Sequence, residues 1–256
     1  MEAWKLLIRS DDLGYSEAVN YGIYKVMQSG ISLSCGLMPN MESAKHGADL
    51  VKDLNVCVGQ HTNICVGRPV SDPKEIPSLV DENGEFYSSR KFHTAKEDFV
   101  VYEEAIREVE AQLFRFRELM GRDPEYFEGH AVRSDNYRKA IRDVAAKYGL
   151  KHSEMYTRGR DTALVNQQIT RRYGINNLTE DYDAVACLKE TVRTTERDYP
   201  GIYVCHPGYV DAYLLKHSSL ALNRTKDAEM LCDPNVLQWL KEQNVELISY
   251  REIGNK

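Results

Sequence analysis

Several features are absent from this 256-residue sequence, and each absence excludes a class of protein. No apolar run is long enough to cross a membrane, and the first residues do not resemble a signal peptide, so we expect a soluble chain. A net charge of -6 argues against general nucleic-acid binding, which needs a basic face. The six cysteines contain no Cys-x-x-Cys pair and lie mostly in apolar runs. We therefore expect reduced core thiols and a cytoplasmic protein.

Internal repeats, linkers and low-complexity segments are also absent. The length fits one α/β barrel, and the 42% hydrophobic and 28% charged residues are ordinary for a globular protein. We predict one domain over residues 1–256.

Two adjacent carboxylates, Asp11 and Asp12, follow the first apolar run. Residues 5–9 are predicted to form a short buried strand, and Ser16 to cap a helix that follows. Ligands collect at the carboxyl ends of strands in parallel α/β folds, and paired carboxylates there call for a nearby cation. A simple strand-to-helix turn capped by Asp12 explains this motif alone equally well.

Strand and helix patterns alternate along the rest of the chain. Further strands are predicted at 31–38, 55–61, 126–130, 201–206 and 245–249. Further helices are predicted near 44–51 and at 97–120, 136–149, 184–197 and 235–243. This alternation indicates parallel βα units rather than an antiparallel sandwich.

Two stretches lack a regular pattern. Residues 68–94 are predicted to form a lid or binding loop, with a plain surface insertion as the equal alternative. Residues 150–183 are predicted to form a second loop layer over the same end of the sheet.

Four predicted strand ends carry ionisable groups: the aspartate pair, His61, His130 and His206. One carboxylate with two neutral imidazoles is a natural divalent-metal site that leaves positions for water and substrate. Asp12, His61 and His130 fit this pattern, which leaves Asp11 free to act as a base. The remaining four histidines are interpreted as ordinary core or surface residues: His46, His93, His152 and His217.

Two polar residues near these ends are candidates for substrate contact or support. Asn63 shares a face with His61 if the strand continues, and it could bind substrate, brace the site or form a turn. Asp211 could orient His206 or lie on a surface loop.

Four short motifs follow one another along the chain: Ser-Asp-Asp-Leu-Gly, Val-Gly-Gln-His-Thr-Asn, Gly-His and His-Pro-Gly-Tyr-Val-Asp. As an ordered set they resemble the YdjC-like carbohydrate deacetylases, the family that includes chitooligosaccharide deacetylase. Arg224 and Glu229 echo an Arg…Glu pattern of the family, and the resemblance covers most of the chain except about 150–200. It implies a TIM-like, incomplete or distorted (β/α) barrel with a mostly parallel sheet.

The same resemblance implies metal-dependent hydrolysis of an N-acetyl group on an amino sugar. Asp12, His61 and His130 match the metal ligands, Asp11 matches the base, and His206 matches a histidine that acts as an acid. The implied metal is Mg²⁺ ahead of Zn²⁺, since two imidazoles favour zinc whereas availability and loose octahedral sites favour magnesium. We expect a small carbohydrate substrate and no nucleic-acid or membrane partner, and a homodimer is compatible with this reading.

One departure from the family leaves the substrate open. Members commonly carry an Asp-x-His-x-His-x-His cluster, whereas residues 128–134 here keep only its first histidine, His130. Arg133 suggests an anionic or differently decorated substrate, with a solvated helix start as the alternative. A hydrolase of another amide or a phosphoester is the alternative within enzymes, because fold and metal ligands do not determine the substrate. A non-catalytic sugar- or metal-binding protein would not need both Asp11 and His206.

Overall fold

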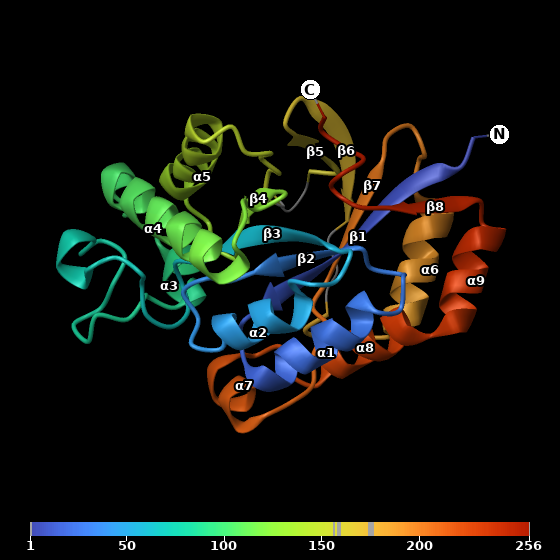
Figure 1. Ribbon diagram of the computed structural model, residues 1–256, viewed down its shortest axis with the longest axis horizontal. Helices are drawn as coiled ribbons and strands as arrows, with labels where there is room; N and C mark the ends of the chain where they lie inside the picture. Colours follow the sequence, from blue (N-terminus) through green and yellow to red (C-terminus); the bar gives the residue numbers. More distant parts are fainter. Residues whose placement is uncertain (1, 156, 158–159, 174–176, 256) are drawn as a thin grey trace.

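The computed structural model describes residues 2–155, 157, 160–173 and 177–255 (Figure 1). Its strands are β1 (Trp4–Leu13), β2 (Ser34–Leu37), β3 (Cys57–Thr62), β4 (Phe127–Gly129), β5 (Thr162–Val165), β6 (Gln168–Tyr173), β7 (Gly201–Cys205) and β8 (Val245–Ile248). They form one sheet in the order β4-β3-β2-β1-β7-β6-β5, and β8 pairs with the first half of β1. All of these neighbours are parallel except the β5–β6 hairpin.

A short segment, residues 151–154, joins the two edges of the sheet. The Phe127 amide of β4 donates to the Lys151 carbonyl at 2.8 Å, and Ser153 forms a bridge with Val165 of β5. The sheet therefore curls into a distorted TIM-like barrel, and the predicted fold class is confirmed.

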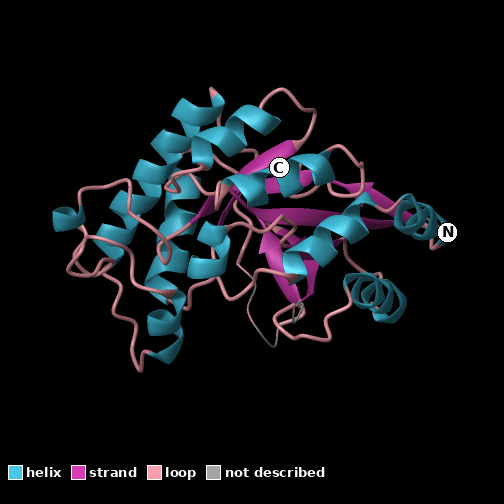
Figure 2. Ribbon diagram, turned by 90° about the horizontal axis from the view of Figure 1, so that it is seen from below, coloured by secondary structure: helices cyan, strands magenta, loops and turns pink. Residues whose placement is uncertain are grey.

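The helices surround this sheet, and Figure 2 shows them from below, lying over the strands. They are α1 (Glu17–Met27), α2 (Ala44–Val51), α3 (Ser89–Thr94), α4 (Tyr102–Met120), α5 (Asp135–Lys147), α6 (Ala184–Thr194), α7 (Ala212–His217), α8 (Asn223–Cys232) and α9 (Pro234–Glu242), with a 3₁₀ turn, η1 (Pro73–Glu75). Ser16 caps α1 as predicted, since its hydroxyl accepts from the Val19 amide. None of the described helices combines the length and hydrophobicity of a membrane span.

A small apolar cluster fills the barrel interior below the carboxyl ends of the strands. Tyr126 and Tyr250 stack at a centroid distance of 3.9 Å and are fully buried. Gly59 permits this packing, because a Cβ atom there would meet the Tyr126 ring at 2.4 Å. This stack lies next to Arg9, whose Nη1 donates to the Tyr250 hydroxyl at 3.0 Å.

The irregular stretches differ in part from expectation. Residues 68–94 contain α3 and bury Ile76, Leu79 and Phe92 against α4, so they form a packed layer. The prediction that 150–183 is only loops is wrong, because β5 and β6 lie there; its residues 156, 158–159 and 174–176 fall outside the described ones. Two adjacent arginines concealed β6, because they lack the apolar alternation of a typical strand: Arg171 pairs with exposed acids, whereas Arg172 is buried.

Other boundaries also shifted. The helix expected from residue 97 begins at Tyr102, and α7 and α8 were not predicted. The strand expected over 5–9 instead continues through both aspartates to Leu13.

Candidate metal centre

A bulge in β1 turns both aspartates toward one site. Ser10 pairs with Cys35 and Leu13 with Leu37, so two residues of β1 oppose only Gly36 of β2. Asp12 adopts φ +75°, a left-handed conformation that aspartate tolerates better than most residues. Side chains that would alternate in a regular strand can therefore face the same end of the barrel.

Asp12 lies at the centre of a compact group of ligand atoms. Its Oδ1 lies 3.2 Å from His61 Nε2 and 3.2 Å from His130 Nδ1, and the two ring nitrogens are 2.8 Å apart. Arg224 Nη2 donates to the other oxygen, Oδ2, at 2.7 Å. The three predicted ligands are thus brought together from the ends of β1, β3 and β4.

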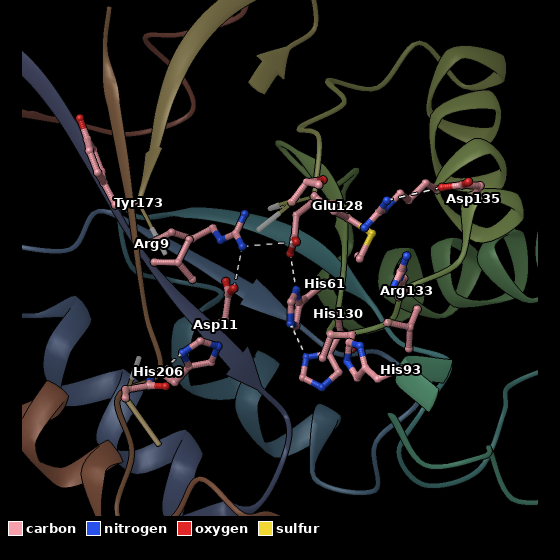
Figure 3. Close-up of a pocket in the computed structure, with 18 residues that line it drawn as sticks. Arg9, Asp11, His61, His93, Glu128, His130, Arg133, Asp135, Tyr173 and His206 are labelled. Carbon is pink, nitrogen blue, oxygen red and sulfur yellow. Dashed lines mark hydrogen bonds and ion pairs between the residues drawn. The ribbon is translucent and has the colours of Figure 1, made fainter. Parts of the chain in front are cut away.

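Glu128 lies behind His61, and Arg9 lies between Glu128 and Asp11 (Figure 3). Glu128 is the register partner of His61 on the neighbouring strand, and its Oε1 contacts His61 Nδ1. A carboxylate on the far nitrogen orients a ligating imidazole and leaves Nε2 for the metal. Arg9 Nη2 donates to Asp11 Oδ2 at 2.6 Å and lies 3.3 Å from Glu128 Oε2.

A second group of donor atoms is formed by Asp11, His61 and Glu128. It is the poorer site for a cation, because the Arg9 guanidinium already bridges its two carboxylates. Asp11 Oδ1 and Asp12 Oδ1 are both buried without a hydrogen-bond partner among the described residues, but it is Asp12 Oδ1 that lies 3.2 Å from a nitrogen of each imidazole. An orphaned buried carboxylate oxygen facing two imidazole nitrogens fits a divalent cation.

The charges of the group also fit a cation. Burial opposes protonation of His61, but Glu128 and Asp11 outweigh it and raise the pKa of His61 to about 10. Burial likewise opposes protonation of His130, but Asp12 raises its pKa to about 9. The buried carboxylates therefore attract positive charge, which protons supply when no metal is bound.

Asp11 keeps one free oxygen. Burial favours its neutral form, but Arg9 outweighs burial and lowers the pKa of Asp11. Its Oδ1 is buried and has no hydrogen-bond partner among the described residues. The carboxylate is therefore ionised and has a free acceptor, as a general base requires.

His206 follows β7 and lines the same cavity. Its backbone amide donates to Asp227 Oδ2 at 2.9 Å, and the Asn177 amide nitrogen lies 3.4 Å from His206 Nδ1. Donation from Asn177 leaves the proton of a neutral ring on Nε2. Burial lowers the pKa of His206, although Asp12 and Asp11 oppose that shift.

Two predicted contact residues have structural roles instead. Asn63 is fully buried; its amide nitrogen donates to Asn40 and to the Val66 carbonyl, and its oxygen accepts from the Cys65 amide. These bonds use both polar atoms of the Asn63 side chain to hold a turn, so the structure does not support a contact between Asn63 and substrate.

Asp211 likewise does not orient His206. Its carboxylate caps α7 through the Leu214 amide and accepts from the Ala18 amide.

One cavity of about 920 Å³ connects these groups. Asp11 and His206 line one side, and the metal-ligand candidates His61 and His130 lie in the middle. The two irregular stretches contribute His93 on one side and Met155, Thr157, Tyr173 and Asn177 on the other. Both irregular stretches therefore contribute residues to the cavity lining, and His93, interpreted from sequence as an ordinary core or surface histidine, is among them.

A family model described as YdjC-like protein matches residues 5–242. The chain belongs to this family. It is 32% identical to carbohydrate deacetylase 2 of Listeria innocua, over 98% of this chain and 100% of the relative. It is 33% identical to the carbohydrate deacetylase of Geobacillus stearothermophilus, over 96% of each chain. The fold is shared with an Enterococcus faecalis structure named for cellobiose-phosphate cleavage, at a TM-score of 0.80 and 22% identity, covering 98% of this chain and 99% of the other.

The departure from the YdjC-like histidine cluster has a structural explanation. Val132 and Ser134 stand where the pattern has later histidines; Val132 is buried in the core and Ser134 caps α5. Between them and His130, Ala131 adopts φ +36°, and the Val132 amide donates to the His130 carbonyl at 2.7 Å. His93 Nε2 lies 2.9 Å from the Ala131 carbonyl and holds this tight turn from outside.

The sequence-based predictions did not include Arg9, which pairs with Asp11, or Glu128, which contacts His61. Arg9 and Glu128 each lie two residues from a predicted site residue on the same strand, a spacing that places side chains on one face. Arg224 was noted only as part of a pattern, and its proposed companion Glu229 is exposed. The buried acidic residue on α8 is instead Asp227, and nothing in the neighbouring sequence predicts that it is buried.

Glycine at position 131 should relieve strain in the turn that carries His130. Because glycine adopts φ +36° freely, we expect Ala131→Gly to leave the free energy of unfolding unchanged or raise it by up to about 1 kcal/mol. Denaturant unfolding measures this change. The matched variant Ala95→Gly, at φ -62° on the exposed end of α3, should lose about 0.5–1 kcal/mol. A larger loss at position 131 than at 95 would contradict the strain.

Metal binding should release protons. The buried carboxylates raise the pKa of His61 to about 10 and that of His130 to about 9, so the metal-free pair binds at least one extra proton at pH 7. The facing ring nitrogens, 2.8 Å apart, cannot both carry a proton. A cation must displace what protons the pair holds between them, so affinity for Zn²⁺ should rise with pH between 6 and 9, by about tenfold per pH unit for each proton released. Calorimetry in buffers of different ionisation enthalpy counts the protons. Affinity independent of pH would show that the rings are neutral before binding.

Proposed function

We propose that the protein is a metal-dependent carbohydrate deacetylase, which hydrolyses the N-acetyl group of an amino sugar or a short oligosaccharide. The observation that carries this proposal is the convergence of a carboxylate and two imidazoles beside a free carboxylate oxygen in one cavity. Full-length similarity to proteins named carbohydrate deacetylase supports the substrate class.

In this proposal Asp12 Oδ1, His61 Nε2 and His130 Nδ1 hold a divalent cation. Such a cation would act as a Lewis acid toward the amide carbonyl and lower the pKa of water. Glu128 orients His61 from behind, and Arg224 holds Asp12 so that Oδ1 faces the cation. We propose Mg²⁺ as the ion; Zn²⁺ is the alternative that this donor set also suits.

Asp11 and His206 divide the proton transfers. Asp11 Oδ1 takes a proton from the attacking water, while Arg9 on its other oxygen keeps the carboxylate ionised until then. As the acid, His206 acts in its imidazolium form: its Nε2 proton passes to the nitrogen of the departing amine as the C–N bond breaks, and a neutral ring remains. Asp12 and Asp11 favour this protonated form, against the burial that lowers the pKa of His206.

The cavity is lined by further residues besides the reacting groups, and these residues can select which sugar binds. Both irregular stretches contribute residues to its lining, and Arg9 lines it from the side of the Tyr126–Tyr250 stack, because Arg9 Nη1 donates to the Tyr250 hydroxyl at 3.0 Å. The six free cysteines fit a reducing compartment, and we propose a cytoplasmic location on that ground.

Acetate release from a panel of N-acetyl sugars and short chitooligosaccharides, with and without chelator, tests the function. We expect Asp11→Asn and His206→Gln to retain the metal and lose on the order of 10²–10⁴ in kcat/KM. His217→Gln, on a histidine of α7 outside the cavity, is the matched control and should retain activity. Metal loss in Asp11→Asn would make Asp11 a ligand, and chelator-resistant acetate release would contradict the metal-dependent mechanism.

A further inference from the structure

A chain of buried hydrogen bonds runs from Asp11 to the segment that joins the two edges of the sheet. Arg9 donates to Asp11 from Nη2, and its other terminal nitrogen, Nη1, donates to the Tyr250 hydroxyl at 3.0 Å. That hydroxyl lies 3.0 Å from the Ser153 hydroxyl, which accepts from Arg172 Nη2 at 2.6 Å. All five residues are at most 6% exposed. The chain therefore connects β1, the residues that follow β8, the joining segment and β6.

Tyr250 has a fixed position in this chain of bonds. Its backbone carbonyl accepts from Lys151 Nζ, its backbone amide donates to Ser34 Oγ at 3.4 Å, and its ring stacks on Tyr126. Tyr250 is fully buried and does not line the cavity, so it does not touch substrate. Its hydroxyl can therefore act on the site only through Arg9.

The contact with Tyr250 affects how Arg9 meets Asp11. Asp11 Oδ2 accepts from Arg9 Nη2, whereas Asp11 Oδ1 has no hydrogen-bond partner among the described residues. An arginine beside a carboxylate frequently pairs through two parallel N–H groups, one to each oxygen. Nη1 could complete such a pair, but Tyr250 holds it instead. Arg9 Nε also lacks a hydrogen-bond partner in the described part of the chain, so it does not help to fix the guanidinium group.

We propose that Tyr250 is a positioning residue, whose hydroxyl holds Arg9 Nη1 and thereby keeps Asp11 Oδ1 free to act as the general base. This inference rests on the proposed function, in which Asp11 takes a proton from the attacking water. Without the hydroxyl, Nη1 is a buried donor without a partner, which is costly. The carboxylate that Nη2 already contacts offers an unoccupied oxygen, Oδ1. Arg9 then engages both oxygens of Asp11, and the base loses its free acceptor.

The test compares Tyr250→Phe with two control variants. Tyr250→Phe keeps the stacked ring and frees Arg9 Nη1. Tyr126→Phe removes the hydroxyl of the other ring in the stack, which has no hydrogen-bond partner among the described residues. Ser153→Ala removes the other partner of the Tyr250 hydroxyl but leaves the bond from Arg9 to Tyr250. A general weakening of the buried network affects Ser153→Ala as well, whereas the loss of Arg9 positioning affects only Tyr250→Phe.

Crystal structures of the metal-free proteins give a result that does not require activity. We expect Arg9 to pair with both oxygens of Asp11 in Tyr250→Phe, and to keep its contact with one oxygen in the two controls. Acetate release by the metal-loaded proteins should show a kcat about tenfold or more below the parent value in Tyr250→Phe, with KM unchanged, because proton transfer to the base belongs to the transition state. Both controls should keep the kcat of the parent protein.

Thermal unfolding shows whether Tyr250→Phe is folded. If it is not, nitrogen-15 spectra of the parent protein replace it. Separate Nη1 and Nη2 signals are expected for Arg9, because bonds to both nitrogens stop rotation about the Cζ–Nε bond. A single averaged signal would overturn the inference.

Failure of this inference and failure of the deacetylase function give different results. An unmoved Arg9 in Tyr250→Phe overturns the inference whatever the activity is. An equal fall of kcat in Ser153→Ala, or a moved Arg9 with undiminished kcat, overturns it as well. If the parent protein releases acetate from none of the sugars, the deacetylase function fails, whereas the crystal structures still show whether Tyr250 keeps Asp11 Oδ1 free.

Discussion

Buried negative charge is the constraint on which the site depends. Asp11, Asp12 and Glu128 are each at most 2% exposed, within one hydrogen-bonded group. Such carboxylates repel one another and are stable in a protein interior only beside positive charge. Arg9 and Arg224 supply two guanidinium groups, which leaves one negative charge unbalanced. Protonated histidine can balance it in the metal-free protein, and a divalent cation can replace that proton.

Three features of the fold bring the buried carboxylates and their positive partners together: a bulge in β1, the register of β3 and β4, and the position of α8. The bulge at Asp12 brings adjacent carboxylates of β1 to one site, and Gly36 opposite leaves room for His61 and Asp11. The register of β3 and β4 then places Glu128 beside His61. Arg224 arrives from α8, more than 200 residues later in the chain, so the charge balance requires the barrel to close. Assembly of the site and formation of the fold are therefore one event.

Much of this arrangement was predictable from local sequence. Apolar runs that end at Asp12, His61, His130 and His206 identify the strand ends, because parallel strands deliver their carboxyl ends to the same face. The bulge was not predictable, since its positive φ depends on pairing with β2. The Arg9–Glu128 contact also depends on which strands are neighbours. Asn63 was predicted as a possible substrate contact, but its side chain forms hydrogen bonds within a turn. The spacing of residues in the sequence does not predict these bonds.

The central claim is that one cation binds at Asp12 rather than at the neighbouring carboxylates. Anomalous diffraction from crystals of the Zn²⁺-loaded protein tests it most directly. The account predicts one peak, bonded to Asp12 Oδ1, His61 Nε2 and His130 Nδ1, with Arg9 still bridging Asp11 and Glu128. A peak between Asp11 and Glu128, with Arg9 displaced, would contradict it.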